Sequence, residues 1–104
     1  MGFISAFLTE TITIEPYERF GGGEILYGPP EERPCRIQPI PETKIVYKNP
    51  SGSLVETVAA ALIFCEGEEI PVNSKITCKG HEHRVIKCAL MRGFGQHHLE
   101  VTID

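Results

Sequence analysis

The sequence lacks several features that would each define a class of protein. No apolar run approaches the ~20 residues that span a bilayer. The first residues, MGFISAFLTE, have neither the basic start nor the cleavage site of a signal peptide. Lysines and arginines are scattered along a chain whose net charge is -4. We therefore expect a protein made in a reducing cytoplasm, without a membrane segment and without a broad face for phosphate backbones.

Catalytic motifs are also missing. The serines, such as Ser51, Ser53 and Ser74, have no nucleophile-elbow context, and the carboxylates are spread over predicted turns. The run Gly21 to Gly23 is followed by neither a lysine nor a helix, so it is not a phosphate-binding loop. The sequence therefore predicts no enzymatic activity and no cofactor.

The dominant pattern in the chain is an alternation of apolar and polar residues with a period of two. It is clearest in residues 11–17, 34–40 and 95–104, and it is typical of strands with one buried face. Residues 54–65 contain enough alanine for a short helix, but β-branched residues at both ends favour a strand. Because strand follows strand with short turns between them, we predict an all-β fold, a small antiparallel β-barrel or sandwich.

The length of 104 residues and the 41% hydrophobic content fit one core. We predict a single domain over residues 1–104, with residues 1–9 as a flexible N-terminal arm. Residues 41–56 are expected to form a mobile loop or hairpin that projects from the barrel. Pro39 and Pro41 interrupt strand pairing at its base, and its tip, NPSGS, is small and polar. An ordinary hairpin fixed against the barrel is the alternative.

The segment CKGHEHRVIKC raises the question of a zinc site made of Cys78, His81, His83 and Cys88. Its spacing is not a usual zinc-binding pattern. If the residues between turn a hairpin, one register puts both cysteines on one face but ~13 Å apart, and the other puts them on opposite faces. Neither register gathers four ligands, so we predict buried free thiols, with a zinc-stabilised module as an alternative.

The last strand is predicted to divide its residues between two faces. Leu99, Val101 and Ile103 should point into the core. The residues between them should lie on the opposite face, where a neighbouring subunit could contact them. This predicted assembly surface consists of His98, Glu100 and Thr102.

The order of these segments resembles a known family. It is carried by ETITI near the start, a glycine-rich arm with YGPP, a central IQP strand, the turn GEEIPVNSKIT and the final MRGFGQHHLEVTI. From Thr11 to Ile103 the chain is similar to the small minor capsid or head-completion proteins of tailed bacteriophages and prophages. The most specific part is Arg92-Gly93 followed by HHLEV. The cysteines and the histidine-containing hairpin tip depart from the family, whose tip is more commonly Asp-Gly-Arg-like.

The resemblance implies a stopper, a structural protein of the virion that forms a homo-oligomeric ring in the neck. Its partners would be portal and adaptor proteins above and tail-completion or tail proteins below. It would hold packaged DNA in the head and touch DNA only in the channel, without sequence specificity. The central loop would reach toward the channel, and its candidate gating residues are Lys44, Tyr47, Lys48, Asn49, Ser51, Gly52 and Ser53.

A binding module of the oligonucleotide-binding type is the alternative on fold alone. Such a module would need aromatic residues set among lysines and arginines in a groove. Tyr17, Phe20 and Tyr27 are not surrounded by enough of them, so the sequence favours the connector interpretation.

Overall fold

The computed structural model describes residues 8–93 and 96–104. Within these residues the chain forms strands and no helix, which confirms the all-β prediction. The strands are β1 (Glu10–Glu15), β2 (Tyr17–Gly21), β3 (Glu24–Tyr27), β4 (Glu31–Lys48), β5 (Leu54–Cys65), β6 (Lys75–Cys78), β7 (His81–Gly93) and β8 (Gln96–Ile103). Most of the predicted N-terminal arm, residues 1–7, lies outside the described residues. In the described part, no helix that could cross a membrane is found.

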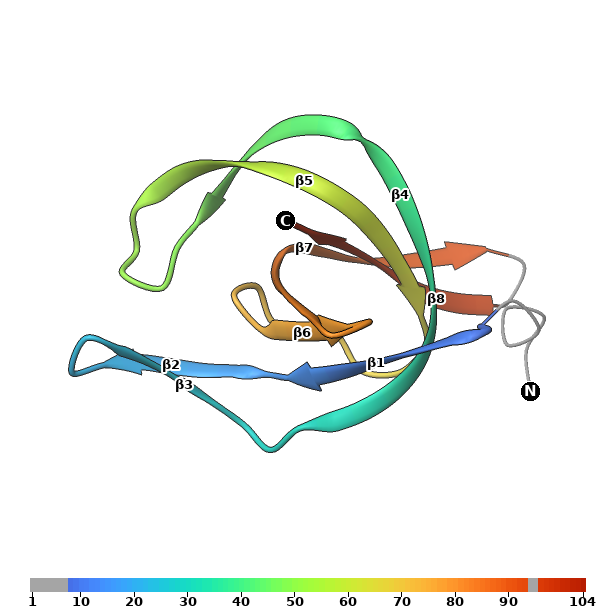
Figure 1. Ribbon diagram of the computed structural model, residues 1–104, viewed down its shortest axis with the longest axis horizontal. Coiled ribbons are helices and arrows are strands. Elements are labelled where there is room, and N and C mark those ends of the chain that lie inside the picture. The colour runs from blue at the N-terminus through green and yellow to red at the C-terminus, as the bar shows by residue number, and fades with distance from the viewer. Residues whose placement is uncertain (1–7, 94–95) are drawn as a thin grey trace.

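In the described chain, six strands close into an antiparallel barrel with the order β1-β4-β5-β8-β7-β6, and β6 pairs back to β1 (Figure 1). The remaining two, β2 and β3, form a separate two-stranded hairpin. Of the two predicted architectures, the structure is therefore the barrel and not the sandwich. A closed barrel leaves no free edge around its wall.

The barrel interior is filled by the apolar residues of the alternating pattern. Leu99, Val101 and Ile103 of β8 are at most 1% exposed, as predicted for the closing strand. The other buried members of this first core are Ile12, Ile14, Cys35, Ala61, Ile63, Cys65, Ile70, Ile76, Cys78 and Val85. Because each strand contributes every second residue, the first core is the direct product of the alternation.

The strands β4 and β5 are longer than their neighbours in the barrel. β1 pairs with β4 only as far as Cys35, and β8 pairs with β5 only from Ala61 onward. Beyond these points β4 and β5 pair only with each other, up to Lys48 opposite Leu54. We call this extension, residues 40–60, the β4–β5 arm.

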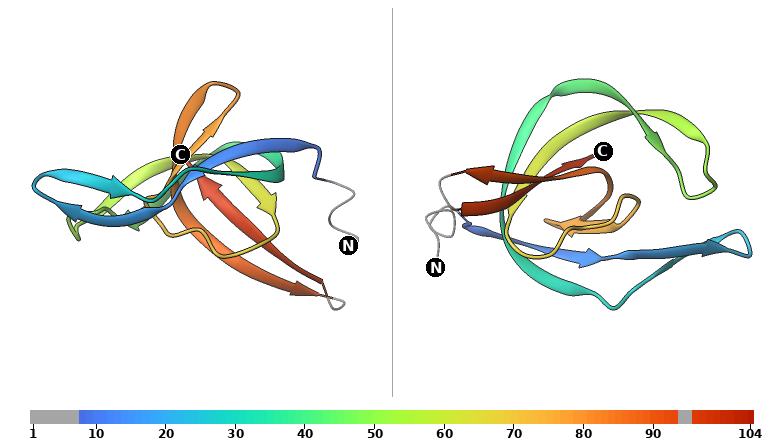
Figure 2. Two further views of the ribbon diagram at one scale, coloured as in Figure 1. Left: turned by 90° about the horizontal axis from the view of Figure 1, so that it is seen from below. Right: turned by 180° about the vertical axis from the view of Figure 1, so that it is seen from behind.

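The arm arches over one end of the barrel, and its tip extends toward the same end of the molecule as the β2–β3 hairpin (Figures 1 and 2). The register shifts between Pro39 and Thr43, which confirms that prolines interrupt the pairing at the base. The whole of residues 54–65 is one strand, so the strand prediction is confirmed over the helical alternative.

The β6–β7 hairpin turns at Lys79 and Gly80, which both have positive φ, as a type I′ turn requires. Cys78 therefore lies opposite His81, and the paired numbers sum to an odd value. That register predicted Cys78 and Cys88 on opposite faces, and this prediction is wrong. A bulge between Val85 and Lys87 inserts one residue and reverses the alternation, so Cys88 packs against the same core as Cys78.

We expect Ile63→Ala to lower the free energy of unfolding by ~2–5 kcal/mol, because Ile63 is fully buried in the first core. Leu54→Ala is the matched control, since Leu54 lies on the same strand but is 74% exposed, and its effect should stay within ~0.5 kcal/mol. Denaturant unfolding followed by circular dichroism measures both. Equal losses in the two variants would contradict the described burial of β5.

Candidate functional site

The β4–β5 arm has one buried face and one exposed face. On its inner face Tyr47 and Ala59 pack against Ile86 of β7, and Ile40, Ile45 and Val55 surround this second core. On its outer face three large apolar side chains meet solvent: Val46 is 59% exposed, Leu54 74% and Val58 42%. The outer side of the arm is therefore uncovered and mixed in character, because Lys44 and Glu56, whose Nζ and Oε1 lie 3.9 Å apart, share it with these apolar side chains.

The arm is attached to the barrel by polar contacts at Tyr47 and Lys48. The guanidinium of Arg84 donates a hydrogen bond to the hydroxyl of Tyr47 and also lies 5.9 Å from the centre of its ring. Asn73 Nδ2 donates to the main-chain oxygen of Lys48 at 3.1 Å. These contacts come from β7 and from the turn before β6, so they tie the arm to a different part of the barrel from its own base.

The predicted loop has the form of a hairpin. Residues 43–48 pair with residues 54–59, and Tyr47 is bonded to Arg84 of the barrel, while the mobility of the arm stays a prediction. Tyr47, a predicted gating residue, is only 7% exposed because it fills the second core. Lys44, Lys48, Ser51, Gly52 and Ser53 are exposed, and Asn49 is half-buried. How fast the amides of the arm exchange stays a prediction.

Asn49 organises the tip of the arm. Its side-chain oxygen accepts hydrogen bonds from the Ser51 hydroxyl at 2.8 Å and from the Ser53 amide at 2.9 Å. Its main-chain oxygen accepts from the amide of Gly52, whose φ of 90° suits a glycine. Of the predicted loop residues, Asn49 thus shapes the turn, while its neighbours present small polar groups to solvent.

A hollow of about 430 Å³ separates the tip from the barrel. Tyr17, Pro50, Val72 and Ile86 supply apolar walls, and Asn73 lies at the same hollow. Asn73 is buried, and its Oδ1 has no hydrogen-bond partner among the described residues. The tip is therefore held at Tyr47 and Lys48 but leaves space beneath it.

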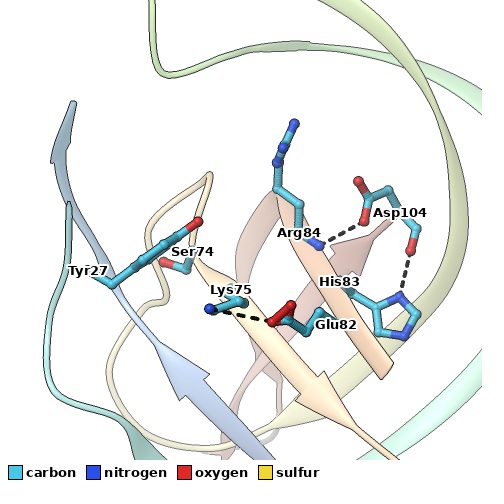
Figure 3. Close-up of a pocket in the computed structure, with 7 residues that line it drawn as sticks. All are labelled: Tyr27, Ser74, Lys75, Glu82, His83, Arg84 and Asp104. Atoms are coloured by element: carbon cyan, nitrogen blue, oxygen red, sulfur yellow. Dashed lines mark hydrogen bonds and ion pairs between the residues drawn. The ribbon is translucent and has the colours of Figure 1, made fainter. Parts of the chain in front are cut away.

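A second, polar hollow of about 230 Å³ lies between the β2–β3 hairpin and β7. Figure 3 shows the residues that line it: Tyr27, Ser74, Lys75, Glu82, His83, Arg84 and Asp104. The lining carries charges of both signs, and Lys75 and Glu82 form an ion pair within it.

Lys75 is at the centre of these pairs. Its Nζ lies 3.5 Å from carboxylate oxygens of both Glu15 and Glu82, and 5.1 Å from the centre of the Tyr27 ring. Burial alone would lower the pKa of Lys75, but Glu15 and Glu82 raise it above its ordinary value. Lys75 therefore remains charged and links the β2–β3 hairpin to the barrel.

The remaining groups of the polar hollow are also engaged in structural bonds. His83 Nδ1 donates to the main-chain oxygen of Asp104 at 2.8 Å, and the Arg84 amide donates to Asp104 Oδ1 at 2.7 Å (Figure 3). Ser74 Oγ is buried and accepts from the amide of Tyr17 at 2.8 Å. These bonds fasten the end of β8 and the start of β2 to the β6–β7 hairpin.

The structure separates the residues of the zinc alternative. Cys78 is buried, His81 is exposed at the hairpin tip, and His83 bonds to Asp104. In the described part of the chain, no group of three or more His, Cys, Asp or Glu residues is arranged to hold a metal ion. Burial also raises the pKa values of the Cys78 and Cys88 thiols, which opposes the thiolate form that metals bind.

The predicted assembly surface on β8 is only partly accessible. His98 and Glu100 are half-buried, and the His98 ring lies 6.1 Å from that of Phe64. Thr102 is 9% exposed, which corrects its assignment to a contact surface. It lies on the outer face, but it is a short side chain between Leu62 and Lys87 on the flanking strands, which cover it.

The sequence interpretation missed Arg84, Asn73 and Ile86, the residues that hold the arm. Asn73 had a signal, because asparagine beside serine in VNSK marks a turn, and its φ is 78° in the structure. No local sequence signal marks Arg84 or Ile86, since their contacts with the arm depend on the bulge in β7.

A scan of the sequence against protein-family models gives no match, and a search of curated proteins also gives none.

We expect the double variant Cys78→Ala, Cys88→Ala to lose about 1 kcal/mol of stability per site through lost packing. Because the described residues form no metal cluster, adding a chelator to the unmutated protein should leave its melting temperature unchanged. A sharp chelator-induced drop in a thermal scan would show that a metal contributes to the fold.

Tyr47→Phe should loosen the arm while leaving the barrel intact, because it removes the acceptor for Arg84 and keeps the ring in the second core. Hydrogen exchange should become faster at residues 45–48 and 54–57, while the amides of Leu99 and Val101 in β8 stay unchanged. Glu42→Gln, at an exposed side chain of the arm, is the control. Unchanged exchange in the arm of Tyr47→Phe would mean that this bond does not hold it.

Proposed function

We propose that the chain is a structural protein of a tailed phage or prophage, a stopper-type component of the head–tail connector. In this role it forms part of a ring in the neck, joins head to tail and helps to keep packaged DNA in the head. Its partners are portal or adaptor proteins on one side and tail proteins on the other. The family resemblance of the sequence supplies this specific role, and the shape of the chain supports it.

The observation that carries the proposal is the uncovered outer face of the β4–β5 arm. A closed barrel needs no free edges, yet this chain extends two of its strands beyond the barrel wall. In the described residues no strand pairs with the outer edges of residues 40–48 and 54–60. Free edges and several large exposed apolar side chains on one face are features that soluble monomers usually limit. Both favour a chain whose arm is covered by a neighbour in an assembly.

Charge also supports a structural rather than a nucleic-acid-reading role. The net charge is -4, and Lys75 of the polar hollow is paired with the carboxylates of Glu15 and Glu82. A protein that lines a DNA channel without binding DNA tightly needs little positive charge. We assign the exposed tip residues Ser51 and Ser53 to the channel side of the ring, because they are small, polar and uncharged.

The proposal is tested first in the genome that encodes the chain. Genes for portal, adaptor and tail proteins should lie beside it, and deletion of the gene should give heads that lose their DNA or fail to join tails. Electron microscopy and measurement of packaged DNA record this result. Normal, infectious particles from the deletion strain would contradict the connector role.

Leu54→Ser should weaken incorporation of the chain into particles at least tenfold without changing its fold, because Leu54 is the most exposed large apolar residue described. Leu54→Met is the matched control, since it keeps the apolar area. Quantitative mass spectrometry of purified particles gives the ratio of this chain to the major capsid protein. If both variants are incorporated equally, the outer face of the arm is not a contact surface.

Glu100→Lys tests the other predicted surface, on β8. Reversing the charge of this half-buried residue should spare folding but reduce the yield of DNA-filled, tailed particles. Glu32→Lys is the control, because it makes the same charge change at an exposed residue of β4. Particles that form and hold DNA normally with Glu100→Lys would remove β8 from the assembly surface.

A further inference from the structure

The four cysteines lie on four different strands of the barrel. Cys35 is on β4, Cys65 on β5, Cys78 on β6 and Cys88 on β7, and all four thiols are free. Only Cys35 and Cys65 are directly opposite each other on neighbouring strands. Cys78 is opposite His81, and Cys88 is opposite Val101. The first pair is fully buried, with both side chains in the first core.

The hydrogen bonds of β4 show which kind of cross-strand pair this is. The amide of Ile37 donates to Glu10 Oε2 at 2.9 Å, so it points toward β1. Main-chain groups in a strand alternate between the two neighbouring strands, and no register shift separates Cys35 from Ile37. The amide and carbonyl of Cys35 therefore also point to β1, and Cys35 forms a non-hydrogen-bonded pair with Cys65.

This type of pair brings its two side chains closest together. The Cα atoms of a non-hydrogen-bonded pair are typically ~4.5 Å apart, which lies within the ~4.4–6.8 Å span of disulfide bonds. Because the two residues are in register, their side chains point to the same side of the sheet. The backbone of β4 and β5 thus already has the separation that a disulfide needs.

We propose that Cys35 and Cys65 are a modification site at which a cross-strand disulfide forms when the chain meets a small-molecule disulfide, such as oxidised glutathione. The thiolate of one cysteine attacks the glutathione disulfide and releases one glutathione thiolate. The second cysteine thiolate attacks the resulting mixed disulfide at the protein sulfur and releases the other glutathione. The protein loses two electrons and two protons, and both end on two reduced glutathione molecules.

Burial controls when this bond can form. Burial raises the pKa of Cys35 to about 12, with smaller contributions from Glu10 and the neighbouring thiols, and burial also raises the pKa of Cys65. The reacting thiolate is therefore scarce in the closed barrel. Disulfide formation belongs to folding, or to openings that separate β4 from β5.

The bond would lie in the barrel wall, at the end of the β4–β5 ladder farthest from the tip of the arm. It would enclose residues 36–64, which include the whole arm, in one covalent loop. Its effect would be to prevent β4 and β5 from separating within the barrel wall, and to stabilise the fold by restricting the unfolded chain. This inference does not depend on the proposed place of the protein in a virion.

The test is to refold the full chain from denaturant in a buffer of oxidised and reduced glutathione, so that burial does not block the reaction. Intact mass should show the loss of two hydrogens, and peptide mapping should link the peptides that contain Cys35 and Cys65. The melting temperature should rise and should return to its original value with dithiothreitol. The variant Cys78→Ala, Cys88→Ala keeps the proposed pair and should behave in the same way, whereas Cys35→Ser should lose both effects.

Two results would overturn the proposal. One is folded protein that retains all its thiol hydrogens in this buffer, and the other is a linked peptide that joins any different pair of cysteines. Both are read from the unmutated chain, so the conclusion does not rely on Cys35→Ser folding well. The experiment needs no partner protein, and its outcome is therefore separate from that of the connector proposal.

Discussion

The rest of the structure depends on the fact that β4 and β5 are longer than the strands that flank them in the barrel. β4 continues beyond the point where β1 leaves it at Cys35, and β5 begins well before β8 joins it at Ala61. A two-stranded sheet is only marginally stable alone, so the extension must bury one face against something. It does so by curving over the barrel end, where Tyr47 and Ala59 meet Ile86. Among the described residues, nothing covers the other face of the arm.

The bulge in β7 makes this arrangement possible. Without the extra residue, Val85 and Ile86 would point to opposite sides of a regular strand, and Cys88 would turn away from the core. With it, Val85 fills the first core, Ile86 meets the arm, and Cys88 returns to the first core. The neighbouring Arg84 is then within reach of Tyr47. One irregularity therefore brings Ile86 of the barrel into contact with the inner face of the arm.

Alternation was enough to predict the strands, the barrel and the inward face of β8, because each depends on local pattern and on burial of one face. The bulge was not predictable, since the apolar pair Val85-Ile86 fits either register. The burial of Thr102 depends on Leu62 and Lys87, which come from strands distant in sequence. Tyr47 falls within the loop that the prolines and the polar tip predict, and only its contacts with Ile86 and Arg84 show that its side chain points inward. The sequence thus named Tyr47 and the exposed residues of the arm, but not Arg84, Asn73 and Ile86, which contact the arm from the barrel side.

The central claim is that the outer face of the arm is covered in an assembly, and surface labelling tests it most directly. Carbene footprinting of Val46, Leu54 and Val58 should be compared between the isolated chain and purified particles. The account predicts strong labelling of all three in the isolated chain, where each is over 40% exposed, and severalfold weaker labelling in particles. Equal labelling of these residues in both states would contradict it.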